Sequence, residues 1–580
     1  MNTLFRRSVL CAAVGAALVL SGCATHSDKL GFADSEGTKT YAEAYEPARQ
    51  MMLQGQWDAM RAKLNENTSR EVKEETKTDD GEIRQTARTE KLTNDEEMER
   101  MIKEQSELAI VERGLLTLNV GDFERALFYF DAAEDKLGLT EADDTVSGAA
   151  SKYGKTGLSV LLGSEEMANY ELRGYEKVML LNYKALCYML MGDRKAYNVT
   201  RRAIDLQQVE WEKFQAVLAE LEKKKEERKQ AAKEGIESID KDIARLQSDI
   251  KQTEREMEEY RNSPGFRNDS LGRSGLKALQ SIIDSDRERI QQQQQNRAEF
   301  VAELSGDDQS MSPSDVDDRT NEVKAKAASV PSAYVNPFGD YLNAMMMEID
   351  GFDDPTMRQN AKIAYKKVVD NNKDCVAARQ AVRNVEKGVG QDKKLVQILL
   401  SDGFSPYQLE KTKVFQIPVK DRVIKAVVNY SNATPVPTQT AGARVMVGGK
   451  STNLSSLTKM ESLILRDEAD RLPLRATMFG LAIMRSAATG ALLGNLGSAL
   501  AGSIQHPDTR SWLTLPNQVY VARIAVPKSQ STLKLETVGE DGGVLATQNV
   551  KLAKDGPTVV YAVSYDKNMQ VYANAFSWVD

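Results

Sequence analysis

The sequence has very few histidines and cysteines for its length. His26 and His506 are the only histidines among 580 residues, and there are four cysteines. A histidine-paired nucleophile or a cluster of histidine ligands is therefore nearly excluded. The cysteines follow no Cys-x-x-Cys or Cys/His spacing, so we expect no structural zinc site, no other metal and no cofactor.

Aromatic residues and excess charge are also scarce. Phe, Trp and Tyr make up 6% of the chain, which favours helices packed through Ala, Leu and Met. The 77 Lys and Arg residues nearly balance 85 Asp and Glu residues, and this mild acidity argues against a general nucleic-acid-binding function. Because 41% of residues are hydrophobic, the chain as a whole is not disordered. At about 150 residues per domain, the length predicts several domains.

The N-terminus reads as an export signal over residues 1–22. Arg6 and Arg7 precede an apolar run, residues 9–20, that is too short to span a membrane as a mature helix. The run ends in Leu-Ser-Gly-Cys at residues 20–23, which resembles the lipobox of bacterial lipoproteins. That resemblance implies cleavage and lipidation at Cys23. Since Ala24 follows rather than Asp, it also implies the outer membrane, facing the periplasm. An ordinary secretory signal is the alternative.

Residues 23–39 would be a tether, and the next 166 or so residues suggest helical hairpins. Small residues and aromatics occur where two helices must approach closely and interlock: Gly114, Gly121, Phe123, Ala126, Phe130 and Ala133. This pattern resembles the tetratricopeptide repeat (TPR), except for Thr117 where a tyrosine is usual. Similar turns recur at Gly55 and Gly192. We therefore expect a TPR-like domain over 40–205, interrupted by a charge-rich excursion at 71–99 and a loop at 140–163.

Apolar residues then recur at heptad spacing from Trp211 to Tyr260 and again from Leu276 to Leu304, with a break at residues 263–265. This predicts an antiparallel coiled-coil hairpin over 206–304, with an intermolecular coiled coil as the alternative. A flexible acidic linker is expected over 305–330, followed by a second TPR-like helical segment over 331–405.

The last third, residues 406–580, has a different pattern. Seven apolar, β-branched runs separated by turn residues predict strands and an antiparallel β-sandwich-like domain: 414–419, 423–430, 443–447, 519–526, 532–538, 544–552 and 558–565. A helical insertion is expected over 457–504. Its uncharged part, 486–504, has the Gly-x-x-x-Gly spacing at Gly490 and Gly494. A buried helical pair or loop is favoured there, and membrane contact or a partner-binding patch are the alternatives.

Residues 183–188, 334–338 and 508–512 together resemble an uncharacterised family of bacterial TPR-containing outer-membrane lipoproteins. The fold expected is thus α+β and multidomain, but the family supplies no activity. Asp508, Arg510 and Trp512 are expected to form a structural latch, because Asp and Arg can pair and Trp can anchor a core. A binding site is the alternative. Cys187 lies in an apolar helical run, which favours a buried free thiol over a disulfide with Cys375.

Short sequences that resemble catalytic motifs are incomplete or occur in the wrong order. Residues 448–451 lack the first glycine of a phosphate-binding loop, where Arg444 stands, and the Lys-Thr-Gly at 155–157 precedes every Ser-x-x-Lys. We therefore expect a non-catalytic scaffold or assembly factor that reaches the outer membrane through Cys23 and binds an unidentified envelope protein. It would not bind nucleic acid, and homo-oligomerisation stays open. The alternatives are a transport or pore assembly that uses the Gly-rich segment and an enzyme acting on cell-wall glycans.

Overall fold

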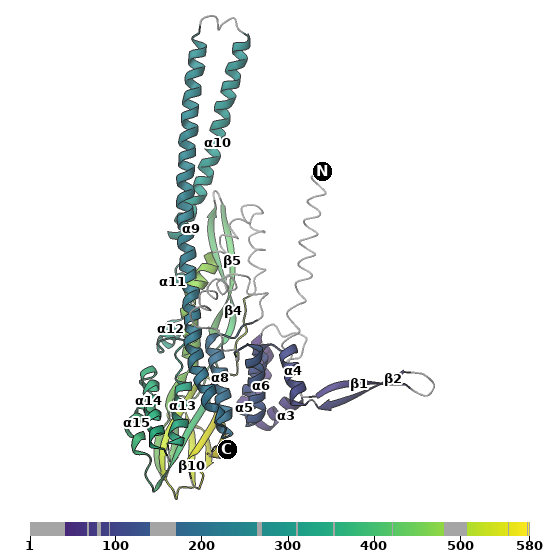
Figure 1. The fold of residues 1–580 in the computed structure, drawn as a ribbon, viewed down its shortest axis with the longest axis vertical. Coiled ribbons are helices and arrows are strands. Elements are labelled where there is room, and N and C mark those ends of the chain that lie inside the picture. Colours follow the sequence, from purple (N-terminus) through teal and green to yellow (C-terminus); the bar gives the residue numbers. More distant parts are fainter. Residues whose placement is uncertain are drawn as a thin grey trace.

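The computed structural model describes residues 41–578, except for 67–68, 78–82, 92, 140–169, 264–269, 309–310, 352–353, 420–421, 481–506, 555 and 577. Within these ranges the fold is α+β. An N-terminal helical region includes one helix of 67 residues, and mixed and antiparallel sheets follow toward the C-terminus. Figure 1 shows a body from which two long helices rise together.

Three pairs of helices are each joined by a turn that contains glycine. The pairs are α2 (Tyr41–Leu53) with α3 (Trp57–Glu66), α5 (Glu107–Asn119) with α6 (Phe123–Lys136), and α8 (Gly174–Leu190) with α9 (Lys195–Arg261). Gly55, Gly121 and Gly192 have φ of 68°, 83° and 76°, which residues with a Cβ rarely adopt. At each turn the glycine amide bonds to the carbonyl three residues back, and the next amide bonds five residues back. The turns predicted at these three glycines are confirmed.

The charge-rich excursion predicted over 71–99 has regular structure. Strand β1 (Ser69–Lys77) pairs antiparallel with β2 (Ile83–Lys91), and α4 (Asn94–Glu104) follows. In Figure 1 this hairpin extends away from the body. The sequences of both strands consist mostly of charged and polar residues, so the apolar alternation that would have indicated strands is missing.

Helix α10 (Ser270–Asp308) returns along the second half of α9, and these two stretches are called the arm. Their seam on α9 buries residues at heptad spacing: Ala232, Ile239, Leu246, Ile250 and Met257. Arg297 bonds to Asp240 at 2.6 Å and Arg287 to Glu254 at 3.0 Å, so the two helices run antiparallel. Tyr260 was predicted in the seam, but it is 41% exposed and lies outside it.

The return from the arm is packed against the body, and the flexible linker expected over 305–330 is corrected where the structure describes it. Helices α11 (Pro313–Val316) and α12 (Asn321–Ala328) occupy this stretch. Val316 and Ala327 are buried, and the buried Arg319 donates to the Leu465 carbonyl at 3.0 Å. The acidic composition was misleading because Asp317 accepts from Arg319 at 2.7 Å instead of facing solvent unpaired.

The segment predicted as helical over 331–405 contains helices and a strand. Its elements are α13 (Phe338–Asp350), α14 (Pro355–Asn371), α15 (Val376–Asn384), the short 3-10 helix η4 (Val385–Lys387) and β3 (Lys393–Asp402). The strand corrects the prediction. Every residue of β3 after Lys393 is buried, so both faces are covered and the sequence shows no alternation.

Two sheets pack face to face in the C-terminal part. A five-stranded sheet has the order β13 (Asn568–Ala575), β12 (Thr558–Tyr565), β3, β9 (Gln518–Pro527) and β8 (Ser455–Lys459). A four-stranded sheet has the order β11 (Val544–Lys551), β10 (Thr532–Val538), β6 (Gly442–Val447) and β7 (Lys450–Asn453). Because β3 pairs parallel with β12, the first sheet is mixed, contrary to the antiparallel expectation. All seven predicted strand positions fall on strands or their immediate ends.

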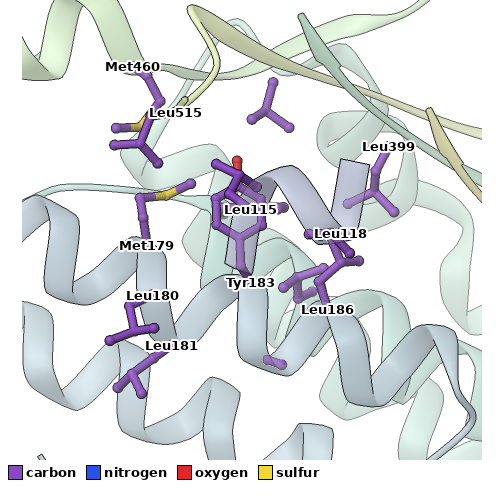
Figure 2. Packing of buried hydrophobic residues seen from close by; sticks show 14 of the residues in the cluster. Leu115, Leu118, Met179, Leu180, Leu181, Tyr183, Leu186, Leu399, Met460 and Leu515 are labelled. Carbon is purple, nitrogen blue, oxygen red and sulfur yellow. The ribbon is translucent and has the colours of Figure 1, made fainter. Parts of the chain in front are cut away.

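The five-stranded sheet is the middle of three layers. One face shares a core with the four-stranded sheet through residues such as Ile398, Leu535 and Ala562. The other face packs on the helices, and Figure 2 shows Leu118 of α5, Leu186 of α8 and Leu399 of β3 in this cluster. A separate hairpin of β4 (Tyr407–Val419) and β5 (Arg422–Thr434) buries Val428 and Tyr430 in a small core with Val316 and Phe479. Helix α16 (Met460–Asp470) begins the predicted helical insertion.

Candidate functional site

The arm is attached where α9 leaves the body. The first turns of α9 lie in the main core through Ala196, Val199 and Ala203. Further along, Phe214 and Leu221 join a second buried cluster with three residues from other elements: Ala333, Tyr334 and Leu474. One continuous helix thus begins in the core, crosses this basal cluster and continues into the arm. Bending it at the base would break both clusters.

A buried network of ions braces the same region. Arg173, at the start of α8, contacts Asp467 at 3.0 Å and Glu468 at 3.3 Å on α16. Arg471 and Arg475 close the network at 2.8 Å to Asp467 and 2.7 Å to Glu468. Burial acts to raise the pKa of Glu468, but Arg475 and Arg173 outweigh it and the net shift is downward. The Glu468 carboxylate is therefore charged, and removing one of its arginine partners would leave a buried charge less well compensated.

Strand β13 caps all three helix pairs. The side-chain amide of Asn568 donates to the Leu53 carbonyl at 2.6 Å, at the end of α2. The Tyr572 hydroxyl donates to the Asn119 carbonyl at 3.0 Å, at the end of α5. Asn574 donates to the Leu190 carbonyl of α8 at 3.1 Å. The three donors occupy even-numbered positions, so they share one face of the strand. They satisfy carbonyls that helix ends leave without an intrahelical partner.

The start of α9 is fixed from the C-terminal side as well. Asp350, the last residue of α13, accepts from Arg194 at 3.0 Å and from the Tyr197 hydroxyl at 2.8 Å. Trp578 donates its indole N–H to the same carboxylate, and the Arg194 guanidinium lies 5.0 Å from the centroid of that indole. Helices α9 and α13 are thereby tied together by a residue that follows the last strand.

The predicted latch residues divide between two roles. Arg510 and Asp508 pair with each other at 2.8 Å in a partly buried position, and Arg510 lies 5.5 Å from the centre of the Tyr170 ring. Trp512 is 1% exposed, and its ring centroid is 6.2 Å from that of Tyr183 on α8. The structure therefore places Trp512 between helices and sheet, whereas Asp508 and Arg510 stabilise their own loop.

Two buried glutamates hold the backbone around Trp512, and sequence reasoning missed both. Glu176 of α8 accepts the Trp512 amide at 2.9 Å and the Tyr170 hydroxyl at 2.7 Å. Glu112 of α5 accepts the Thr514 amide at 3.0 Å and also the Thr514 hydroxyl and the Leu513 amide. Burial raises the pKa of Glu112 to about 8. A glutamate inside an apolar helical run, as in Ile110-Val111-Glu112, was the available signal.

The predicted TPR packing residues lie mainly at the contact between α5 and α6. A Cβ on Gly114 would lie 2.7 Å from Cε1 of Phe130, so glycine allows this aromatic ring to approach the helix. Ala126 and Ala133 are fully buried. Phe123 packs instead against Tyr572 of β13, with ring centroids 5.6 Å apart. Gly121 forms the turn before it.

Two cysteines and several short segments that the sequence singled out carry no reactive site in the described residues. Cys187 and Cys375 are buried free thiols, and burial raises the pKa of both, which disfavours the reactive thiolate. Residues 448–449 form the turn between β6 and β7, and residues 450–451 begin β7. Cys23, the loop at 140–163 and the uncharged segment at 486–504 lie outside the described residues. In the described part of the chain, no group of side chains could hold a metal ion and no helix could span a membrane.

Comparison with known proteins yields no match. No family model matches the chain, no curated protein matches its sequence and no solved structure matches its fold. Among the described residues, the arm and its braced base are the features that bear most directly on function.

Proposed function

We propose that this protein is a non-catalytic scaffold or assembly factor of the bacterial cell envelope. Acyl chains on Cys23 would hold it to the outer membrane, facing the periplasm. The helix pairs would act as TPR-like units, the arm as a coiled-coil hairpin that binds an envelope protein, and the two packed sheets as a β-sandwich-like base.

The observation that carries this proposal is the continuity of α9 from the core into the arm. At about 1.5 Å per residue, a helix of 67 residues is about 100 Å long. Its N-terminal end is held by Asp350 and the core, and its middle by the basal cluster. Such a helix can present a binding surface far from the body without losing its orientation.

The surface of the arm suits reversible protein binding. Its exterior carries many ion pairs between neighbouring turns, such as Glu237 with Lys241 at 2.7 Å. Large apolar side chains also reach solvent there, including Ile282 at 50% and Val301 at 37% exposure. A partner that covered one of these apolar side chains would enclose it in a polar, charged rim, which is the usual arrangement of a protein interface.

The proposal is tested by shortening the arm without disturbing its base. Removing residues 239–298 and joining 238 to 299 through a short Gly-rich turn retains the close contact between Gly235 and Phe300. We expect in-cell crosslinking and mass spectrometry to detect a partner for the native chain and to lose it for the shortened chain. Removal of the β1–β2 hairpin, residues 69–91, is the matched control and should retain the partner.

Two further results would test binding through the arm and attachment through Cys23. A partner that still crosslinks to the shortened chain would refute binding through the arm. When residues 1–22 are replaced by an ordinary cleavable secretory signal, Cys23→Ser should move the protein from the membrane fraction to the soluble periplasm. Its retention in the membrane would refute the lipid anchor as the sole attachment.

A further inference from the structure

One surface of the body is basic although the chain as a whole is acidic. Helices α14 and α15 with η4, residues 355–387, contain eight Lys and Arg residues but only three Asp and Glu residues, whereas the whole chain has a net charge of -8. Because Lys362 of α14 pairs at 2.6 Å with Glu386, which follows α15, the two helices run antiparallel side by side. In Figure 1 they lie at the end of the body opposite the tip of the arm.

The inner sides of both helices are held in the main core. Tyr365 and Val368 of α14 and Ala378 and Ala381 of α15 are fully buried there. The opposite sides of the two helices are therefore exposed together on one surface of the body. This surface is called the basic face, and its exposed residues include Ile363, Lys366, Lys373, Val376, Arg379 and Arg383.

The positive charges of the basic face are not neutralised by neighbouring carboxylates. Three of its basic residues form no ion pair within the part of the chain that the structure describes: Lys373, Arg379 and Arg383. Lys366 lies 3.5 Å from Asp370, but both side chains are exposed and solvent screens this pair. A cluster of uncompensated positive charges attracts an anionic partner.

Two branched apolar side chains protrude among these charges. Ile363 is 55% exposed and Val376 is 43% exposed. A helical surface that combines basic and exposed apolar residues suits the interface of a membrane, because the basic residues meet anionic headgroups while the apolar side chains enter the boundary with the acyl chains. Charge alone would suit an acidic protein equally well, so the apolar residues favour a lipid surface.

The position of the basic face also fits a chain that is anchored at Cys23. Residues 23–40 link the expected anchor to α2 and span at most about 60 Å when fully extended. Such a tether keeps the body close to the leaflet and raises the effective concentration of headgroups at the basic face. Since the arm extends from the opposite end of the body, contact through this face directs the arm away from the membrane.

We propose that the basic face binds the anionic phospholipid headgroups of the membrane that carries the Cys23 anchor, with Ile363 and Val376 entering the headgroup region. The arm then points away from the leaflet. This inference deepens the proposed function and rests on its lipid anchor. The contacts are weak and salt-sensitive, so they orient an anchored chain but do not retain the Cys23→Ser chain on washed membranes.

The test measures cosedimentation of the non-acylated chain, Cys23→Ser behind an ordinary secretory signal, with lipid vesicles. One set of vesicles is pure phosphatidylcholine, and the other contains about one-third phosphatidylglycerol. We expect binding only to the anionic vesicles, and its loss at about 1 M salt, where the Debye length falls to about 3 Å. Arg379→Gln combined with Arg383→Gln should weaken binding about 25-fold, because each basic residue near an anionic surface contributes about fivefold.

The matched control is Lys251→Gln combined with Arg255→Gln on the arm. These two residues are exposed and lie four positions apart on α9, as Arg379 and Arg383 do on α15, and the change in net charge is the same. The control variant should bind anionic vesicles like the unsubstituted chain, because the arm points away from the leaflet. Circular dichroism melting checks that both variants are folded.

A fluorescent label tests the orientation. Once its signal is cleaved, the non-acylated chain has no cysteines except the buried Cys187 and Cys375, so an environment-sensitive dye labels an introduced surface cysteine selectively. With Ile363→Cys we expect the emission to shift to shorter wavelength on anionic vesicles, and with Tyr260→Cys, near the tip of the arm, we expect no shift. An unchanged emission at position 363, or a shift at position 260, would overturn the proposed orientation.

The remaining outcomes separate this inference from the proposed function. Absence of binding to anionic vesicles, or equal weakening in the α15 and arm variants, would overturn the inference. Crosslinking of position 363 to an acidic protein in cells, without vesicle binding, would make that protein the occupant instead. The arm-shortened chain retains α14 and α15 and should still bind vesicles. Vesicle binding without a partner would refute only the role of the arm, whereas a partner without vesicle binding would refute only the basic face.

Discussion

Replacing Gly121 by alanine should destabilise the protein much more than replacing Gly138 by alanine. Both glycines end helices through the same turn, with φ of 83° and 64°. Holding alanine in this left-handed conformation costs about 1–2 kcal/mol at either site. A Cβ on Gly138 would have no neighbour within 4 Å, whereas a Cβ on Gly121 would overlap the ring of Tyr572. The effect of Gly138→Ala on the free energy of unfolding therefore measures only the cost of the left-handed backbone conformation.

Displacing the Tyr572 ring has a further effect that can be worked from its contacts. It would break the hydrogen bond from its hydroxyl to the Asn119 carbonyl and the edge contact with Phe123. These contribute about 1 kcal/mol each, so Gly121→Ala should lower the free energy of unfolding by about 3–4 kcal/mol in all. When Tyr572 is already alanine, Gly121→Ala should lower the free energy of unfolding only as much as Gly138→Ala does.

The measurement is equilibrium urea unfolding of the chain, followed by circular dichroism, with all four variants in parallel. If Gly121→Ala and Gly138→Ala lowered the free energy of unfolding equally, Tyr572 of β13 would not restrict the residue at position 121. If Gly121→Ala lowered the free energy of unfolding by the same amount with and without Tyr572→Ala, the assigned contact would be refuted.

Three further predictions concern titration and surface charge. Burial raises the pKa of Glu112 from 4.5 to about 8, so between these pH values the folded chain holds a proton that the unfolded chain releases. The free energy of unfolding should therefore fall as pH rises from about 4.5 to about 8, and Glu112→Gln should flatten that slope in urea titrations. Burial raises the pKa of Asp340 from 3.8 to about 6 against the opposing effects of Lys367 and Asn371, so the free energy of unfolding should also fall as pH rises from about 4 to about 6. A slope in this range that Asp340→Asn leaves unchanged would contradict this assignment. The Arg297–Asp240 pair lies on the exposed surface of the arm, so Arg297→Ala should leave the thermal midpoint unchanged, and a clear drop would contradict its solvent-screened role.

The parts of the fold that could be predicted from the sequence are those coded by neighbouring residues. The turn at Gly121 and the close approach of Phe130 to Gly114 follow from local spacing, as does the heptad seam with Ile239 and Leu246. Strand β3 could not be recognised, because a strand covered on both faces loses its apolar alternation and looks like a buried helix segment.

The candidate sites depended on long-range pairing and were less accessible to sequence reasoning. The partners of Glu112 lie about 400 residues further along the chain. One surface cavity beside the base of the arm is lined by both Trp211 of α9 and Asp340 of α13, and nothing in the sequence of either helix indicates the other. Trp512 could be predicted as an anchor from its type, but not the two glutamates that accept the amides around it.

The three caps supplied by β13 also set an order of events during biosynthesis. Asn568, Tyr572 and Asn574 are separated from the carbonyls they cap by 515, 453 and 384 residues. The ribosome therefore releases every helix pair long before the strand that completes it. Contacts of such separation form slowly. The body therefore stays incomplete until nearly the whole chain has been synthesised, and its fold closes only when this late strand reaches the early helices.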